Sequence, residues 1–223
     1  MTASKMQPLR AADPAHAVTI KICGITCEAD AHAAIRAGAD FVGFVFYPAS
    51  RRHLDEAALG WLREVAGAKK VGVFRDQPLD LVQRVRDAAR LDIVQLHGDE
   101  PPEACAELGG RGRVIKAIAP SASLDWGKVA AYGEVVRVLF DTPSASGGGT
   151  GRTFEWRWLD GRPPGLAFWI AGGLTPENVG AAVRELRPAG VDVASGVEAT
   201  VGRKDPGKIR NFIAAVRDAE LES

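Results

Sequence analysis

The amino-acid sequence predicts a single-domain (β/α)8 barrel, the TIM-barrel architecture, over residues 17–223. Eight short apolar runs alternate with about eight stretches of helical pattern, and the repeating unit spans roughly 25 residues, which suits such a barrel. This part of the chain starts with a strand and ends with a helix, which favours closure of the sheet. A doubly wound open sheet fits the same alternation and is the alternative fold.

The strands are predicted from runs of apolar and β-branched residues without a polar face, as in parallel sheets covered on both sides. The first run contains Val18, Ile20 and Ile22, and at its C-terminal end come Lys21 and Cys23. The predicted strands are residues 17–22, 41–46, 70–74, 92–96, 113–118, 135–140, 166–170 and 191–194.

The helices are predicted from apolar stripes and from capping residues at their starts. Thr26 is expected to cap the first helix and Thr175 the one after the seventh strand. The predicted helices are residues 28–37, 55–66, 78–89, 103–108, 124–132 with an interruption at Gly127, a short one at 154–159, and two that start at 175–177 and 205–206.

Composition excludes several classes of protein. The 223 residues are 46% hydrophobic and 25% charged, and 28 basic residues balance 28 acidic ones, so neither nucleic acid nor a strongly charged partner is indicated. No apolar run reaches the roughly 20 residues of a membrane span. Three cysteines at irregular spacing argue against a disulfide framework and for the cytoplasm. Residues 1–16 are interpreted as a flexible N-terminal extension without a signal peptide.

The C-terminal ends of the predicted strands carry the polar and glycine residues expected of a barrel's active site. Glycine turns fall after strands six, seven and eight, where exposed backbone N–H groups can bind phosphate; the simpler interpretation is that these glycines only permit tight turns. The candidate site residues at these ends are Cys23, Arg52, His97, Asp141, Gly148, Gly149, Gly151, Gly172, Gly173, Ser195 and Gly196.

Cys23 and Asp141 follow strands one and six and form a candidate acid/base pair. A thiolate can remove a proton and a carboxylic acid can donate one, provided that their environments set their pKa values apart. Cys23 could instead be a small buried apolar residue, and Asp141 a turn residue. A metal site on Cys23 and Cys27 lacks further ligands, and Cys105 is expected to pack inside the fourth helix.

Arg52, or its neighbour Arg51, could hold a substrate carboxylate through two parallel N–H donors. The simpler interpretation is a solvated loop arginine. His97 could orient the substrate or only hydrogen-bond a neighbouring turn.

These strand-end segments resemble the phosphoribosylanthranilate isomerases of tryptophan biosynthesis, over residues 18–216. Ala194 departs from the pattern, because the family more often has serine there. The matching segments are 21–26 (KICGIT), 43–46 (GFVF), 50–52 (SRR), 94–98 (VQLHG), 140–142 (FDT), 148–151 (GGTG) with Phe154, 171–178 (AGGLTPEN) and 192–198 (DVASGVE).

The resemblance implies an Amadori rearrangement of N-(5-phosphoribosyl)anthranilate. Asp141 would protonate the furanose oxygen and Cys23 would remove the C2′ proton. Arg52 would hold the anthranilate carboxylate, and the glycine loops and Ser195 would hold the phosphate. No cofactor, metal, nucleic acid or membrane is implied, only a phosphorylated sugar substrate, and the chain could be a monomer or a homodimer.

Two other functions fit the same residues. A related sugar-phosphate isomerase of histidine biosynthesis performs the same chemistry on a similar barrel, but resembles a design with an aspartate in place of Cys23. A non-catalytic barrel that only binds a phosphorylated metabolite is the other alternative.

Overall fold

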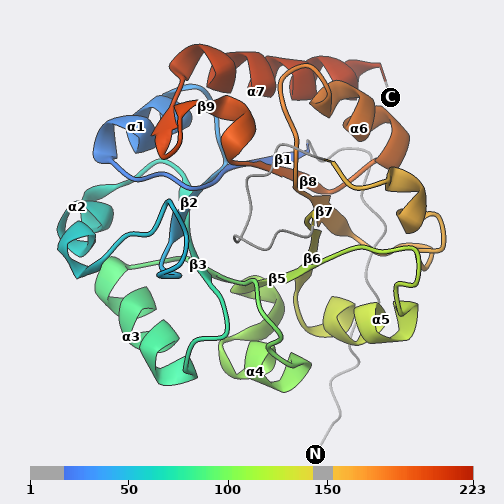
Figure 1. Ribbon diagram of the computed structural model, residues 1–223, viewed down its shortest axis with the longest axis horizontal. Helices are drawn as coiled ribbons and strands as arrows, with labels where there is room; N and C mark the ends of the chain where they lie inside the picture. The colour runs from blue at the N-terminus through green and yellow to red at the C-terminus, as the bar shows by residue number, and fades with distance from the viewer. Residues whose placement is uncertain (1–17, 143–152, 223) are drawn as a thin grey trace, which may run out of the picture.

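The eight strands form one closed parallel barrel in the computed structural model, which describes residues 18–142 and 153–222 (Figure 1). The strands follow chain order, and β8 pairs with β1, with Ile20 opposite Val191. Closure confirms the predicted fold, and the open sheet is wrong. The strands are β1 (Thr19–Ile22), β2 (Phe41–Val45), β3 (Lys69–Phe74), β4 (Ile93–Leu96), β5 (Val114–Ile118), β6 (Arg137–Phe140), β7 (Phe168–Ile170) and β8 (Gly190–Val193).

Helices surround the barrel on its outside (Figure 1). The α-helices of the described residues are α1 (Glu28–Arg36), α2 (Leu59–Glu64), α3 (Leu79–Ala89), α4 (Pro102–Glu107), α5 (Trp126–Val135), α6 (Val179–Leu186) and α7 (Pro206–Leu221). Four short 3-10 helices accompany them: η1 (Glu56–Ala58), η2 (Gly110–Gly112), η3 (Trp156–Leu159) and η4 (Ser195–Val197).

The barrel interior is a packed core, because alternate strand residues point inward and fill it. The rings of Phe41 and Trp169 meet edge to face with centroids 5.2 Å apart. A side chain at Gly190 would approach the Trp169 ring to 2.5 Å, so this position must stay small. Ligands can therefore bind only at an end of the barrel. The inward layer consists of Phe41, Val71, Ile93, Ile115, Ala117, Leu139, Trp169 and Ala171.

The last helix, α7, closes the ring of helices beside α1 and α6 (Figure 1). This helix starts at Pro206, as predicted, and Asp205 caps it: its Oδ1 accepts hydrogen bonds from the N–H groups of Gly207 (2.7 Å) and Lys208 (3.1 Å). Its predicted apolar stripe is buried, which anchors the end of the chain on the barrel; the residues are Ile209, Phe212, Ile213 and Val216.

Two predicted caps are wrong. The Thr26 hydroxyl donates to the Gly202 carbonyl instead of capping α1, whose N-cap position is Cys27. Thr175 begins a turn rather than α6, which starts at Val179. The turn is fixed by Asn178, whose Oδ1 accepts from the Thr175 N–H (2.8 Å) and whose Nδ2 donates to the Gly173 carbonyl (2.9 Å). Local side-chain bonds of this kind compete with the first helical turn.

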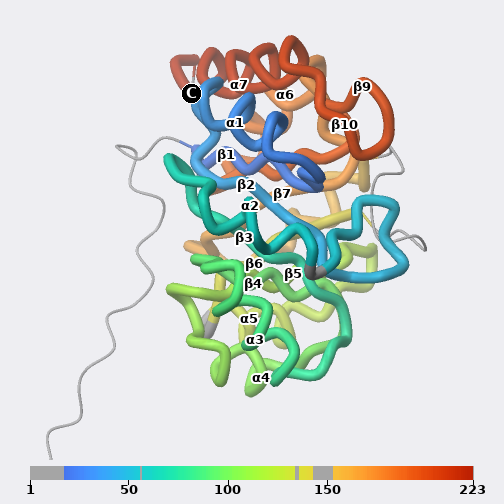
Figure 2. Tube along the Cα trace, turned by 90° about the vertical axis from the view of Figure 1, so that its left-hand side faces the viewer, coloured from blue at the N-terminus to red at the C-terminus, as the bar shows by residue number. Residues whose placement is uncertain are grey.

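Three further details differ from the prediction. Helix α5 begins at Trp126 and includes Gly127 without interruption. Asp125, the residue before Trp126, caps the helix by accepting a hydrogen bond from the Gly127 N–H. The segment at 154–159 forms only the 3-10 helix η3. A hairpin of β9 (Glu198–Thr200) and β10 (Arg203–Lys204), which was not predicted, projects beyond one end of the barrel (Figure 2).

The N-terminal segment 1–16 lies outside the described residues. Among the residues that are described, no helix has the length and apolar character needed to cross a membrane.

Candidate active site

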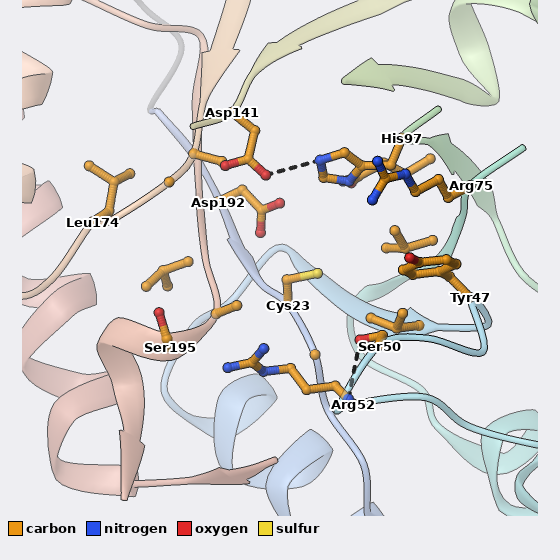
Figure 3. Close-up of a pocket in the computed structure, with 18 of the residues that line it drawn as sticks. Cys23, Tyr47, Ser50, Arg52, Arg75, His97, Asp141, Leu174, Asp192 and Ser195 are labelled. Carbon is orange, nitrogen blue, oxygen red and sulfur yellow. Dashed lines mark hydrogen bonds and ion pairs between the residues drawn. The ribbon is translucent and has the colours of Figure 1, made fainter. Parts of the chain in front are cut away.

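A pocket opens at the C-terminal ends of the barrel strands, where (β/α)8 enzymes place their active sites (Figure 3). Its enclosed part holds about 70 Å3, and an adjoining cavity of about 610 Å3 shares Arg75, His97 and Asp141 with it. The two form one cleft across the strand ends. Of the predicted site residues, the pocket brings together Cys23, Arg52, His97, Asp141, Gly172, Gly173 and Ser195.

Cys23 directly follows β1, and its thiol points into the pocket (Figure 3). Its backbone N–H donates to the Val193 carbonyl of β8 at 2.8 Å, which fixes the residue at the barrel rim. Only 8% of the residue is exposed. Burial raises the pKa of the Cys23 thiol, and the Lys21 ammonium offsets part of this rise, so that the pKa stays above its ordinary value.

Lys21 points into the barrel and is completely buried. Its Nζ donates to Asp192 Oδ2 at 2.7 Å, and this charge raises the pKa of Lys21 although burial alone would lower it. A Cβ at Gly43 would lie 2.8 Å from Cys23 Sγ and 3.1 Å from Lys21 Cε. The missing side chain at Gly43 therefore gives the thiol and the lysine room to lie close together.

Asp192 lines the pocket, and its second oxygen, Oδ1, is buried without a hydrogen-bond partner in the described part of the chain. Figure 3 shows its carboxylate between Cys23 and Asp141. This oxygen can accept a hydrogen bond from a ligand hydroxyl.

Asp141 directly follows β6 and enters the pocket opposite β1 and β2 (Figure 3). Its Oδ2 lies 3.1 Å from His97 Nε2, which comes from the end of β4. Gln95 Nε2 lies 3.5 Å from the other ring nitrogen of His97. The His97 ring and the Asp141 carboxylate are therefore within hydrogen-bond reach of each other at the pocket wall.

Arg52 lines the pocket, whereas Arg51 is exposed outside it. The Arg52 guanidinium is already engaged on one edge: Nε and Nη2 each donate to the Glu198 carboxylate at 2.7 Å. The Glu198 bonds raise the pKa of Arg52, so it stays charged. Nη1 and the outer hydrogen of Nη2 have no hydrogen-bond partner within residues 18–142 and 153–222, and can bind a ligand.

Two of the glycine turns that were predicted to bind phosphate follow β7 and β8 in the structure. Gly172 has φ +85°, and a Cβ there would lie 2.1 Å from Thr142 Oγ1, so only glycine fits the turn. The N–H groups of Gly172 and Gly173 have no hydrogen-bond partner among the described residues. The backbone of Gly196, the residue after Ser195, lies directly against the Leu174 carbonyl. Gly148, Gly149 and Gly151 lie outside the described residues.

Comparison with known proteins agrees with this geometry. The family model of N-(5'phosphoribosyl)anthranilate (PRA) isomerase matches residues 20–215. The chain belongs to the PRA isomerase family. Its sequence is 47% identical over 206 residues to N-(5'-phosphoribosyl)anthranilate isomerase of Thiobacillus denitrificans, covering 90% of this chain and 98% of that one. The corresponding enzyme of Pelobacter propionicus is 44% identical over 210 residues, covering 92% and 99%.

Solved PRA isomerase structures share the fold. The crystal structure of the enzyme from Thermotoga maritima aligns with a TM-score of 0.80 and 39% identity, over 90% of this chain and 99% of that one. A PRA isomerase in complex with reduced 1-(o-carboxyphenylamino)-1-deoxyribulose 5-phosphate aligns with a TM-score of 0.76 and 36% identity, over the same shares.

Sequence reasoning missed two charged residues, Asp192 in the pocket and Glu198 just outside it. Asp192 carried a signal, because it is an acidic residue inside the otherwise apolar run of β8, and such a residue must face a polar partner or a ligand. Glu198 carried no local signal, since its partner Arg52 is far away in sequence and the hairpin that begins at Glu198 was not predicted. The sequence analysis named Lys21 only as a neighbour of Cys23. It did not predict that Lys21 is buried and paired with Asp192.

Proposed function

We propose that the protein is the isomerase of tryptophan biosynthesis that converts N-(5-phosphoribosyl)anthranilate to 1-(2-carboxyphenylamino)-1-deoxyribulose 5-phosphate. The observation that carries this proposal is the convergence of a thiol and a carboxyl group on one pocket, from β1 and β6, beside an arginine and two glycine turns. Membership of the PRA isomerase family supports the same reaction.

Asp141 acts first, as the general acid. It donates a proton to the ring oxygen of the furanose while the anilino nitrogen lone pair forms a C=N bond and the C1′–O bond breaks. His97, 3.1 Å from the carboxylate, can return a proton to Asp141 after each cycle. The product of this step is an open-chain iminium ion.

Cys23 acts second, as the general base. Its thiolate removes the C2′ proton, the C–H electron pair forms C1′=C2′, and the C=N electrons return to nitrogen. The resulting enolamine tautomerises to the ketone. Because the pKa of the thiol is raised, the thiolate fraction and therefore the rate should increase with pH.

The remaining groups bind and orient the substrate in this proposal. Arg52 receives the anthranilate carboxylate on its free guanidinium edge. The turns at Gly172–Gly173 and Ser195–Gly196 hold the phosphate, together with Gly148, Gly149 and Gly151. The reaction transfers only protons, and no step in it calls for a cofactor. A cytoplasmic enzyme, as a monomer or homodimer, is proposed; a dimeric PRA isomerase is known from Thermotoga maritima.

The test compares three outcomes with purified protein. Freshly generated phosphoribosylanthranilate should be consumed and the ketose phosphate should form, whereas the aminoimidazole aldose of histidine biosynthesis should not react. Turnover of the aminoimidazole substrate alone would assign the chain to the histidine pathway. Tight binding of phosphoribosylanthranilate without turnover would support a non-catalytic binding protein.

A further inference from the structure

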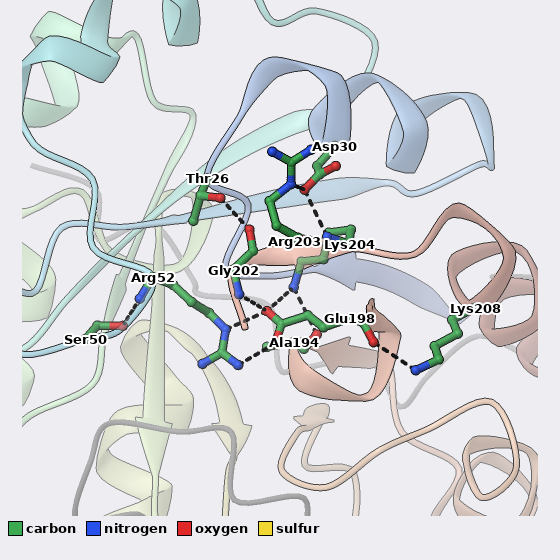
Figure 4. A network of polar contacts seen from close by, with 10 residues as sticks. All are labelled: Thr26, Asp30, Ser50, Arg52, Ala194, Glu198, Gly202, Arg203, Lys204 and Lys208. Carbon is green, nitrogen blue, oxygen red and sulfur yellow. Dashed lines mark hydrogen bonds and ion pairs between the residues drawn. The ribbon is translucent and has the colours of Figure 1, made fainter. Parts of the chain in front are cut away.

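Glu198 is a buried carboxylate just outside the pocket, at the start of the β9–β10 hairpin, and nothing above gives it a role. Its side chain is 5% exposed and accepts two hydrogen bonds from Arg52, at Oε1 from Nε and at Oε2 from Nη2, both 2.7 Å long (Figure 4). This bidentate pairing fixes the plane of the guanidinium. Arg52 therefore enters the pocket in one orientation.

The rest of Arg52 is equally constrained. Its backbone N–H donates to Ser50 Oγ at 3.2 Å, and a Cβ at Gly24 would lie only 2.4 Å from Arg52 Cδ, so the stem lies directly on Gly24. With the Nε edge closed by Glu198, the outer edge of Nη1 and Nη2 is what Arg52 can offer to a ligand. A planar carboxylate fits this edge end-on.

Glu198 also joins the arginine to the turn after β8. Lys204 Nζ donates to Glu198 Oε1 at 3.1 Å and to the Ala194 carbonyl at 2.9 Å (Figure 4). Ala194 immediately precedes Ser195, which lines the pocket. Lys208 Nζ donates to the Glu198 carbonyl at 2.8 Å and holds the hairpin from α7. A single carboxylate thus ties together Arg52 and the start of the Ser195 turn.

The charges in this network do not cancel. Two buried cations, Arg52 and Lys204, share the one carboxylate of Glu198, so the group keeps a net positive charge beside the pocket. Such a charge favours an anionic ligand at this wall.

We propose that Glu198 is a positioning residue that orients Arg52 toward the carboxylate of the substrate and fixes its place relative to the Ser195 turn. Glu198 would thereby determine selectivity for substrates that carry a carboxylate on the aromatic ring. The inference rests on the proposed function, in which Arg52 binds that carboxylate.

The experiment measures the inhibition constants of two ligands: the reduced product analogue 1-(2-carboxyphenylamino)-1-deoxyribitol 5-phosphate, and the same compound without the ring carboxyl. Wild-type protein should prefer the first by about 10- to 100-fold, the contribution of a charge-assisted hydrogen-bond pair. In Glu198→Gln this preference should fall below about threefold and the KM should rise about 10-fold or more, with kcat within about threefold of wild type. Glu107→Gln, an exposed carboxylate on α4, is the control and should change neither.

Two further variants separate the possible failures. Arg52→Lys should also lose the preference; if it keeps the wild-type preference, Arg52 does not bind the carboxylate and that part of the proposed function fails. If Arg52→Lys loses the preference but a folded Glu198→Gln keeps it, the positioning role is wrong. If Glu198→Gln does not fold, Glu198→Asp takes its place. This variant retains the negative charge between Arg52 and Lys204 but is one methylene shorter. Loss of the preference in it supports the positioning role, and retention of the preference contradicts that role.

Discussion

Replacing Lys21 by methionine should make Cys23 a weaker acid and shift the pH dependence of the reaction. Lys21 and Cys23 both touch the space at Gly43, which puts the lysine Cε and the thiol sulfur no more than about 6 Å apart. At an effective dielectric constant of about 20, a unit charge at this distance stabilises the thiolate by roughly 2.8 kcal/mol. Lys21→Met removes this stabilisation of the thiolate.

The expected result is a rising limb of kcat/KM that moves to higher pH, because the thiolate of Cys23 loses the stabilising charge of Lys21. At a fixed pH below the pKa, activity should fall about 100-fold, and it should recover as the pH is raised. The assay is steady-state loss of anthranilate fluorescence between pH 6 and 10. The alkylation rate of Cys23 by iodoacetamide, measured in a Cys27→Ser background because Cys27 is partly exposed, should shift in parallel. Burial raises the pKa of Cys105 to about 11, which keeps that thiol unreactive.

The matched control is Lys70→Met. Lys70 is also buried, but its Nζ donates to the Leu62 carbonyl, away from the pocket. Its loss should leave the pH profile unchanged. A Lys21→Met protein that folds and keeps the wild-type profile in both assays would refute the electrostatic role assigned to Lys21.

Three more predictions follow from the structure. Arg52→Ala should raise KM about 10-fold or more with little change in kcat, measured by steady-state kinetics; an unchanged KM would remove Arg52 from the binding site. Phe212→Ala, at a fully buried position of α7, should cost about 3–5 kcal/mol in urea unfolding, and a loss below about 1 kcal/mol would show that α7 contributes little. Burial alone would raise the pKa of Glu198, but Arg52 and Lys204 lower it below its ordinary value, so its contribution to stability is present above about pH 4.3 and is lost as the pH falls through the lowered pKa. The difference in unfolding free energy between wild type and Glu198→Gln should therefore shrink in acid, and a constant difference between pH 3 and 7 would contradict the ion-pair assignment.

The barrel was predictable because its signal is local and repeated. Each strand is an apolar run covered on both faces, and the alternation with helices recurs along the whole chain, so errors of one or two residues at element ends did not matter. Caps were less predictable. Thr26 and Thr175 have the right residue type for a cap. The Thr26 hydroxyl instead donates to the Gly202 carbonyl, which is distant in sequence, and the Asn178 side chain holds the backbone of Thr175 in a turn.

The candidate site was predictable only where chemistry coincides with a strand end. Cys23, His97 and Asp141 directly follow strands, and the structure brings their side chains into one pocket. Arg52 was predicted, but its pairing was not, because Glu198 reaches it from a hairpin whose position depends on the closed barrel. The patterns used to predict strands and helices are local, so they cannot predict a pair of residues that are this far apart in sequence.

The roles of Cys23 as the base and Asp141 as the acid of one isomerisation can be tested by measuring the turnover of single-substitution variants. Purified wild type, Cys23→Ser and Asp141→Asn should each be mixed with freshly generated phosphoribosylanthranilate while anthranilate fluorescence is followed. Wild type should lose fluorescence rapidly, and both variants should have rates about 100- to 10,000-fold lower with an unchanged circular dichroism spectrum. Near-normal turnover in either variant would contradict the role of that residue, and no turnover in wild type would contradict the assigned reaction.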